Sequence, residues 1–73
     1  MAKQQAGQAK GLRLPHLAAY RRRAALSQRE LAEKASVTRQ TVIRAESGEG
    51  IRYSNVRKLA DALGVTPEAL AGW

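Results

Sequence analysis

Two helix-start signals lie close together in the middle of the chain, and their spacing constrains the fold more than any other feature. The segment "SQRE" is a capping box, in which the Ser27 hydroxyl can accept from the Glu30 amide and the Glu30 carboxylate from the Ser27 amide. Thr38 is a second good N-cap, eleven residues after Ser27. The sequence therefore predicts two short helices joined by a turn of about three or four residues, which forces a steep crossing.

Apolar periodicity predicts one helix before this pair. Leu14 and Leu17 recur at helical spacing within 12–25, and Pro15 suits a first turn because its missing N–H has no helical partner there.

Two more helices are expected after the pair. Ser54 or Asn55 is expected to cap a fourth helix that ends at Gly64, and Thr66 a short fifth one. No stretch predicts a strand. The expected fold class is therefore all-α, with five short helices around one small Leu/Val/Ala core.

The charge of the chain is unevenly distributed. The net charge is +7, yet residues 1–29 hold seven bases and no acid, while six bases balance six acids in the remainder. Such an excess attracts a polyanion, either nucleic acid or an anionic membrane surface. Residues 1–11 are rich in Gln, Ala, Gly and Lys and are expected to form a disordered basic arm, with one domain over 12–73.

The residue types on the outer face of the predicted third helix suit base reading. Arg39 and Arg44 can each donate two hydrogen bonds to guanine, and Gln40 can pair with adenine in the same bidentate way. An aliphatic side chain such as Ile43 can pack on a thymine methyl group. These four residues are the candidate base-reading set.

Two stretches also carry a family pattern. "LSQRELAEKASVTRQTVIRAESG" and "KLADALGVTPEAL" hold the Leu-Ser-Gln, Glu-Leu-Ala, Glu-x-Gly and Leu-Gly-Val elements at family spacing. Residues 12–71 thus resemble the lambda-repressor/Cro-like, or XRE, family of DNA-binding domains. The resemblance implies a compact five-helix domain whose helix over 38–47 enters the major groove of double-stranded DNA. It also implies a bacterial or phage transcriptional regulator, expected to be a repressor that binds a palindromic site as a homodimer.

The resemblance assigns roles to further residues. The implied phosphate contacts are Ser27, Gln28, Thr38, Arg52, Tyr53 and Ser54. A structural ion pair is implied between Arg21 and Glu46. Leu70 and Trp73 are candidate contacts between the two copies of a dimer.

The chain departs from the family pattern at a few positions. Ser36 stands where the family usually has glycine, at a turn position that favours positive φ, and serine there is expected to cost ~1 kcal/mol. Ala25 replaces another glycine that is common in the family. Tyr53 replaces a common proline, and Ile43 stands where polar residues are usual.

Two rival functions stay open at this point. The same fold could serve as a protein-interaction module, antitoxin-like or a bridging coactivator, which would use Ile43, Leu70 or Trp73 against protein. Alternatively, the basic first third could bind a membrane surface. The large apolar anchors available for that role are a thin set. They are Leu12, Leu14, Leu17 and Tyr20.

Other classes of function find no pattern in the sequence. Cysteine is absent, which excludes disulfides and thiolate metal sites, and the lone His16 lacks a second ligand at helical spacing. No catalytic set, cofactor motif or small-molecule effector site is visible, so the chain is not expected to be an enzyme. Without a signal peptide or a membrane span it is expected in the cytoplasm, associated with the nucleoid.

Overall fold

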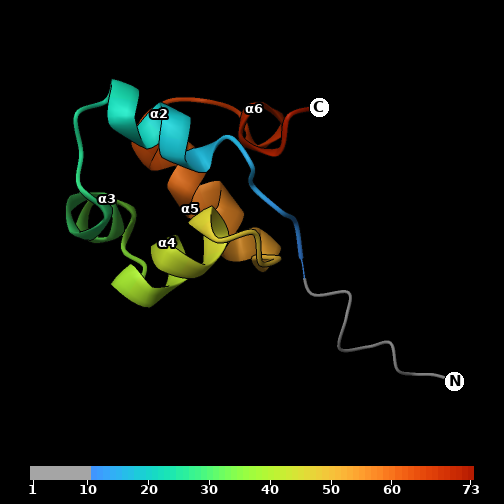
Figure 1. The fold of residues 1–73 in the computed structure, drawn as a ribbon, viewed down its shortest axis with the longest axis horizontal. Helices are drawn as coiled ribbons and strands as arrows, with labels where there is room; N and C mark the ends of the chain where they lie inside the picture. The colour runs from blue at the N-terminus through green and yellow to red at the C-terminus, as the bar shows by residue number, and fades with distance from the viewer. Residues whose placement is uncertain (1–10) are drawn as a thin grey trace, which may run out of the picture.

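The computed structural model describes residues 11–73, and within this range the chain forms five α-helices and no named strand (Figure 1). The helices are α2 (Leu17–Arg23), α3 (Gln28–Ala35), α4 (Arg39–Glu46), α5 (Tyr53–Leu63) and α6 (Pro67–Ala71). The predicted all-α, five-helix fold is confirmed. Of the expected basic arm over 1–11, all but Gly11 lies outside the described residues.

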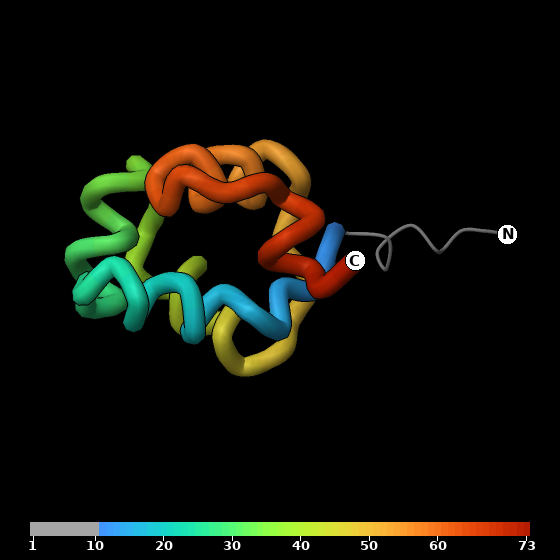
Figure 2. Tube along the Cα trace, turned by 90° about the horizontal axis from the view of Figure 1, so that it is seen from above, coloured from blue at the N-terminus to red at the C-terminus, as the bar shows by residue number. Residues whose placement is uncertain are grey.

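The helices surround one apolar core. α5 packs against α3 and α6, while α2 packs against α4 and α6, and the helices enclose the core when seen from above (Figure 2). The buried apolar residues are Leu14, Leu17, Leu31, Ala32, Ala35, Val42, Ala45, Ile51, Val56, Leu59, Ala60 and Leu70. No polar or charged residue of the described range is fully buried. The small Leu/Val/Ala core is thus the one that helical periodicity predicts, with Ile51 added from a loop.

The central helix pair begins where the sequence predicts. The Ser27 hydroxyl accepts from the Glu30 amide at 3.0 Å, and the Glu30 carboxylate accepts from the Ser27 amide at 2.8 Å. The Thr38 hydroxyl accepts from the Thr41 amide at 3.1 Å and caps α4. Only residues 36–38 separate α3 from α4, so the predicted short turn is confirmed.

The prediction for the first helix was wrong at its start. α2 begins at Leu17 instead of residue 12, because Leu12 pairs with Ile51 in an isolated antiparallel bridge. The Leu12 amide donates to the Ile51 carbonyl at 2.8 Å, and the Ile51 amide donates back at 2.9 Å. Leu14 also precedes Pro15, and the residue before a proline is disfavoured in helical conformation. Pro15 therefore lies in the turn before the helix.

The predicted cap of the fourth helix was also wrong. Arg52 is the N-cap of α5 and makes no side-chain capping bond, so Ser54 lies inside the first turn. The Arg52 carbonyl accepts from the amides of Asn55 and Val56, which starts the helix earlier than the Ser-Asn signal indicates.

The last helix matches its prediction, with one correction about its contacts. The Thr66 hydroxyl caps α6 and Pro67 takes the first position. Leu70, a candidate dimer contact, has 0% exposure and lies in the core, so it is closed to a second chain. Trp73 is exposed.

Candidate nucleic-acid interface

The two faces of α4 differ sharply in burial. Val42 and Ala45 anchor the inner face in the core. The outer face carries Arg39, Gln40 and Arg44, all exposed to solvent. Ile43 is half-buried, so only part of its side chain is open to a ligand, although the sequence placed it on the outer face with the other three residues. α4 thus presents three long polar side chains on a helix held by its opposite side.

Arg21 and Glu46 form an ion pair that joins α2 to α4. The Arg21 Nε donates to Glu46 Oε2 at 2.5 Å, and its Nη2 donates to Oε1 at 3.1 Å. Arg21 also donates to the Leu26 carbonyl at 2.9 Å, and Gln28 Nε2 donates to Glu46 Oε1 at 3.0 Å. The network therefore links three helices and fixes the orientation of α4 against its neighbours.

The protonation of Glu46 reflects these contacts. Burial alone would raise the pKa of Glu46, but the hydrogen bonds from Arg21 and Gln28 and the charges of Arg21 and Arg22 outweigh burial, so the pKa lies below its usual value. The hydrogen bond to Glu46 likewise raises the pKa of Arg21, against the opposing effect of burial. The pair is therefore charged at neutral pH.

The residues predicted to contact phosphate near the starts of α3 and α4 keep some hydrogen-bonding capacity beyond their bonds within the protein. The Ser27 and Thr38 hydroxyls each accept a backbone amide, and a hydroxyl that accepts still has a proton to donate. Thr38 shares a further bond with the Thr41 hydroxyl at 2.9 Å. The Gln28 amide group has two N–H donors, of which one goes to Glu46. The other remains for a ligand.

The start of α5 offers open backbone amides. Its N-cap Arg52 makes no side-chain capping bond, so no side chain covers the first-turn N–H groups of the helix. Arg52, Tyr53 and Ser54 are all exposed there. A helix N-terminus with a free arginine beside it attracts an anion through both its amides and its partial positive charge.

A polar recess lies between α4 and the start of α5. It measures about 340 Å³, and Arg44 and Arg52 are among its lining residues. The others are Thr41, Glu49, Gly50, Ile51 and Asn55. Sequence analysis missed Glu49 and Asn55 as members of this site. Glu49 lies in the loop over 47–52, for which periodicity gives no signal, and Asn55 lies in the first turn of α5, which begins earlier than predicted.

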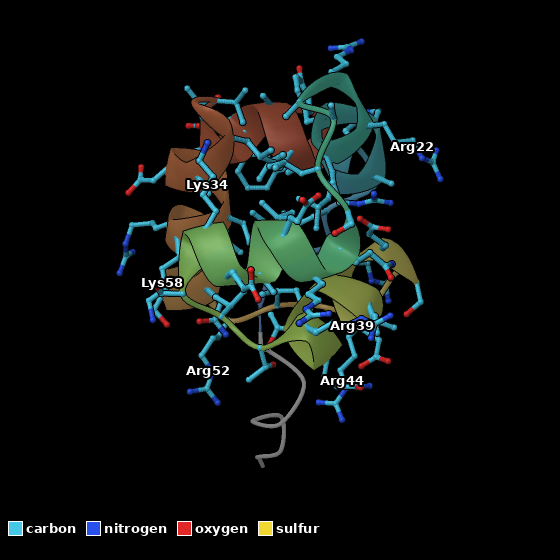
Figure 3. All side chains as sticks on the ribbon, turned by 90° about the vertical axis from the view of Figure 1, so that its left-hand side faces the viewer. Arg22, Lys34, Arg39, Arg44, Arg52 and Lys58 are labelled. Atoms are coloured by element: carbon cyan, nitrogen blue, oxygen red, sulfur yellow. The ribbon has the colours of Figure 1, made fainter. Side chains whose placement is uncertain are left out.

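The labelled basic side chains are spread over the surface in Figure 3, with Lys34 and Lys58 on the left side of the view. Arg39, Arg44 and Arg52 lie together in the lower half of this view, on α4 and at the start of α5. Arg22 lies apart from them, at α2 in the upper half. Arg39, Arg44 and Arg52, three of the predicted DNA contacts, therefore lie in the same half of this view, and Arg22 lies in the other half.

The described residues form neither a metal-binding cluster nor a membrane-spanning helix. Over 11–73, no group of three or more His, Asp or Glu side chains could hold a metal ion. No helix in the same range is long and apolar enough to cross a bilayer.

A comparison with protein families identifies the class of helical protein to which the chain belongs. A family model described as Helix-turn-helix matches residues 17–70, which is most of the chain. The chain belongs to this family. The helix-turn-helix is α3, the turn over 36–38 and α4, and the XRE-type resemblance in the sequence is confirmed. The protein is accordingly a DNA-binding regulator of the helix-turn-helix class. No curated protein matches the chain.

Proposed function

We propose that the protein represses transcription by binding a specific double-stranded DNA sequence, with α4 in the major groove. The observation that carries this proposal is the outer face of α4, where Arg39, Gln40 and Arg44 stand exposed beside the recess that holds Arg52. Arginine and glutamine read guanine and adenine through paired hydrogen bonds. Ile43 offers its exposed part to a thymine methyl group.

Phosphate contacts on both sides of α4 would fix its register. Ser27 and Gln28 have donors available on one side, beside the exposed Thr38 hydroxyl, and Arg52 with its neighbours Tyr53 and Ser54 offers donors on the other. Contacts to phosphates position a protein on the duplex, while contacts to base edges give specificity. The Arg21–Glu46 pair contributes indirectly, because it orients α4 between these two groups.

We further propose that two copies bind a palindromic site. One helix-turn-helix domain reads only a half-site, and two copies related by two-fold symmetry place their recognition helices about 34 Å apart, one turn of B-DNA. Occupancy of such a site over a promoter would block transcription, and would hold the protein on nucleoid DNA.

Selection of a random double-stranded DNA pool at about 150 mM salt tests the proposal, because weak backbone attraction fades as salt rises. An enriched palindrome is expected. Substituting Arg39 or Arg44 by Ala should then cost about 1–3 kcal/mol of binding and relax selection at one base position. A pool that remains unenriched would overturn the proposal.

Arg22→Ala supplies a matched control. Arg22 is also an exposed arginine, but it lies on α2, away from Arg39 and Arg44 (Figure 3). The control should keep the wild-type base preferences and nearly the wild-type affinity. If Arg22→Ala relaxed base selection as much as Arg39→Ala, α4 would not be the reading helix.

The rival function as a protein-interaction module finds less support. Of its three candidate contacts, Leu70 is buried and Ile43 is half-buried, which leaves Trp73. A pull-down that captured a protein partner equally well with and without Arg39→Ala and Arg44→Ala, together with no DNA selection, would favour this rival.

A further inference from the structure

The two large apolar side chains that stay exposed in the described range lie at the same groove. Tyr53 is 62% exposed and Trp73 is 79% exposed. Both line a groove of about 370 Å³ between α5 and α6, with Leu12, Val56 and Pro67. Exposed aromatic residues around an apolar groove are characteristic of a protein contact, because tryptophan and tyrosine dominate binding energy at interfaces.

Two charged residues of opposite sign complete the lining of the groove. Arg57 lies on α5 and Glu68 on α6, and both side chains are exposed. The ion pairs of the described range are Arg21–Glu46 and Arg29–Glu33, so Arg57 and Glu68 form no ion pair within the chain. The groove thus offers one positive and one negative partner, on different helices, together with two exposed aromatic residues.

We propose that this groove is the contact between two copies of the chain. In a two-fold contact the same patch serves both copies, so a contact from one residue to another occurs twice. Arg57 of each copy would face Glu68 of the other, and Trp73 of each copy would cover the apolar lining of the other's groove. A surface that carries both a positive and a negative residue can pair with its own copy, whereas a surface of one sign would repel its own copy.

The small size of the groove limits how tightly two copies can bind each other. Seven residues line the groove, and a standard stable interface uses about 20–30 residues a side. The contact is therefore weak in free solution. It becomes effective on DNA, where two half-sites hold the copies at high effective concentration. This step rests on the proposed function, since it names the surface through which the two DNA-bound copies meet.

Charge reversal tests the contact without DNA. R57E and E68R each place like charges opposite one another at both symmetry-related positions. Each should weaken self-association at least about tenfold, measured by sedimentation equilibrium at high protein concentration. An equimolar mixture of the two variants should associate again, because the two reversed charges then meet as opposites in the mixed dimer.

Rescue by mixing is the decisive outcome. A pairing within one chain would not be restored by a second chain, so only a contact between copies predicts it. K58E is the matched control, because Lys58 follows Arg57 and is exposed but does not line the groove. It should leave association unchanged. A wild-type chain that stays monomeric at every concentration, or variants that stay apart when mixed, would overturn the proposal.

Trp73 provides an independent signal, because it is the one tryptophan of the chain. Its emission should shift to shorter wavelength as wild-type protein concentration rises, and the shift should be absent for R57E alone. An emission independent of wild-type concentration would contradict burial of Trp73 between copies.

Binding to a single half-site separates this inference from the proposed function. If R57E binds one half-site like wild type but loses cooperative binding to the palindrome, both stand. If wild type reads one half-site but never pairs, the groove inference fails alone. If no sequence is preferred at all, the proposed function fails, and the solution experiment still decides the groove.

Discussion

Ala25 and Ser36 hold left-handed backbone at the ends of α2 and α3, although neither is glycine. Their φ values are 59° and 60°. A side chain in this conformation places Cβ near the carbonyl oxygen and costs roughly 1–2 kcal/mol. Positive φ was predicted at Ser36 from the resemblance to the family, whereas Ala25 was identified only as a position where glycine is common. These two residues therefore mark where the fold stores avoidable strain.

Ser36→Gly should stabilise the protein by about 1 kcal/mol, which is about 4–8 °C in melting temperature for a domain of this size. Thermal unfolding followed by circular dichroism measures the change. Ser54→Gly makes the same substitution within the right-handed helix α5 and should destabilise instead. If both variants shifted the melting temperature in the same direction, strain at Ser36 would not be the cause.

The buried end of the Arg21–Glu46 pair makes stability sensitive to acid. The folded pKa of Glu46 is lowered, so its contribution is complete above the unfolded value, about 4.3. The contribution is lost as the pH falls through the lower, folded pKa. E46Q should cost about 1–3 kcal/mol at neutral pH.

Denaturant titrations of wild type and E46Q across pH measure this effect. The difference between the two proteins should be constant near neutrality and shrink under strongly acid conditions. E33Q is a suitable control, because the Arg29–Glu33 pair is exposed, with 3.6 Å between Arg29 Nε and Glu33 Oε2, and such pairs contribute little. A difference for E46Q that grew on acidification would show that charged Glu46 does not stabilise the fold.

At the scale of the element, the N-terminus of α4 combines two functions that substitutions at Thr38 can separate. Its hydroxyl caps the helix, and its exposed position suits a phosphate contact. Thr38→Ala should lose about 1 kcal/mol of stability. Thr38→Asp keeps a good cap and favours the helix dipole, so stability should hold. Its carboxylate should nevertheless weaken DNA binding at least about tenfold through repulsion.

Melting temperatures measure the stability of Thr38→Ala and Thr38→Asp, and DNA titrations measure their affinity for DNA. Ser27→Asp repeats the change at the cap of α3, which is also proposed to contact a phosphate, and should behave like Thr38→Asp. Equal DNA affinity for wild type and Thr38→Asp would place the phosphate backbone away from this helix end.

The helix boundaries show what local sequence can predict. The caps of α3, α4 and α6 depend on side chains within three residues of the backbone they bond, so their signals are complete in the sequence. The start of α2 follows the pairing of Leu12 with Ile51, which are far apart along the chain. The periodicity of apolar residues does not predict a contact between residues so far apart in the sequence.

The candidate site divides in the same way. Helical periodicity was sufficient to place Arg39 and Arg44 on the outer face of α4. The bond from Gln28 to Glu46 and the inclusion of Glu49 in the recess arise from packing between elements and from a loop conformation. Neither follows from spacing along the chain.

At the scale of the whole molecule, charge alone does not locate the DNA-binding face. The excess of basic residues lies in 1–29, yet the proposed reading residues come from the balanced remainder. Arg23 of the basic part lies over the Tyr20 ring at 5.0 Å. The general attraction to a polyanion and the proposed selection of a DNA sequence therefore belong to different parts of the chain.

The salt dependence of binding should separate those parts. Arg52→Ala should weaken binding to all sequences alike and reduce the slope of log affinity against log salt by about 0.9, the value for one phosphate. Arg39→Ala should chiefly change which base is preferred. Fluorescence anisotropy at several salt concentrations, on matched and mismatched DNA, measures both quantities. An unchanged slope for Arg52→Ala would show that this arginine contacts no phosphate.

The opposite faces of α4 have a consequence for how new DNA specificities arise. The helix is retained by Val42, Ala45 and Glu46, while Arg39, Gln40 and Arg44 make no contribution to the core. Surface substitutions away from such contacts usually change stability by less than about 0.5 kcal/mol. The outer three positions can therefore be exchanged as a set, so that a library randomised at these sites would sample new operators on an unchanged scaffold.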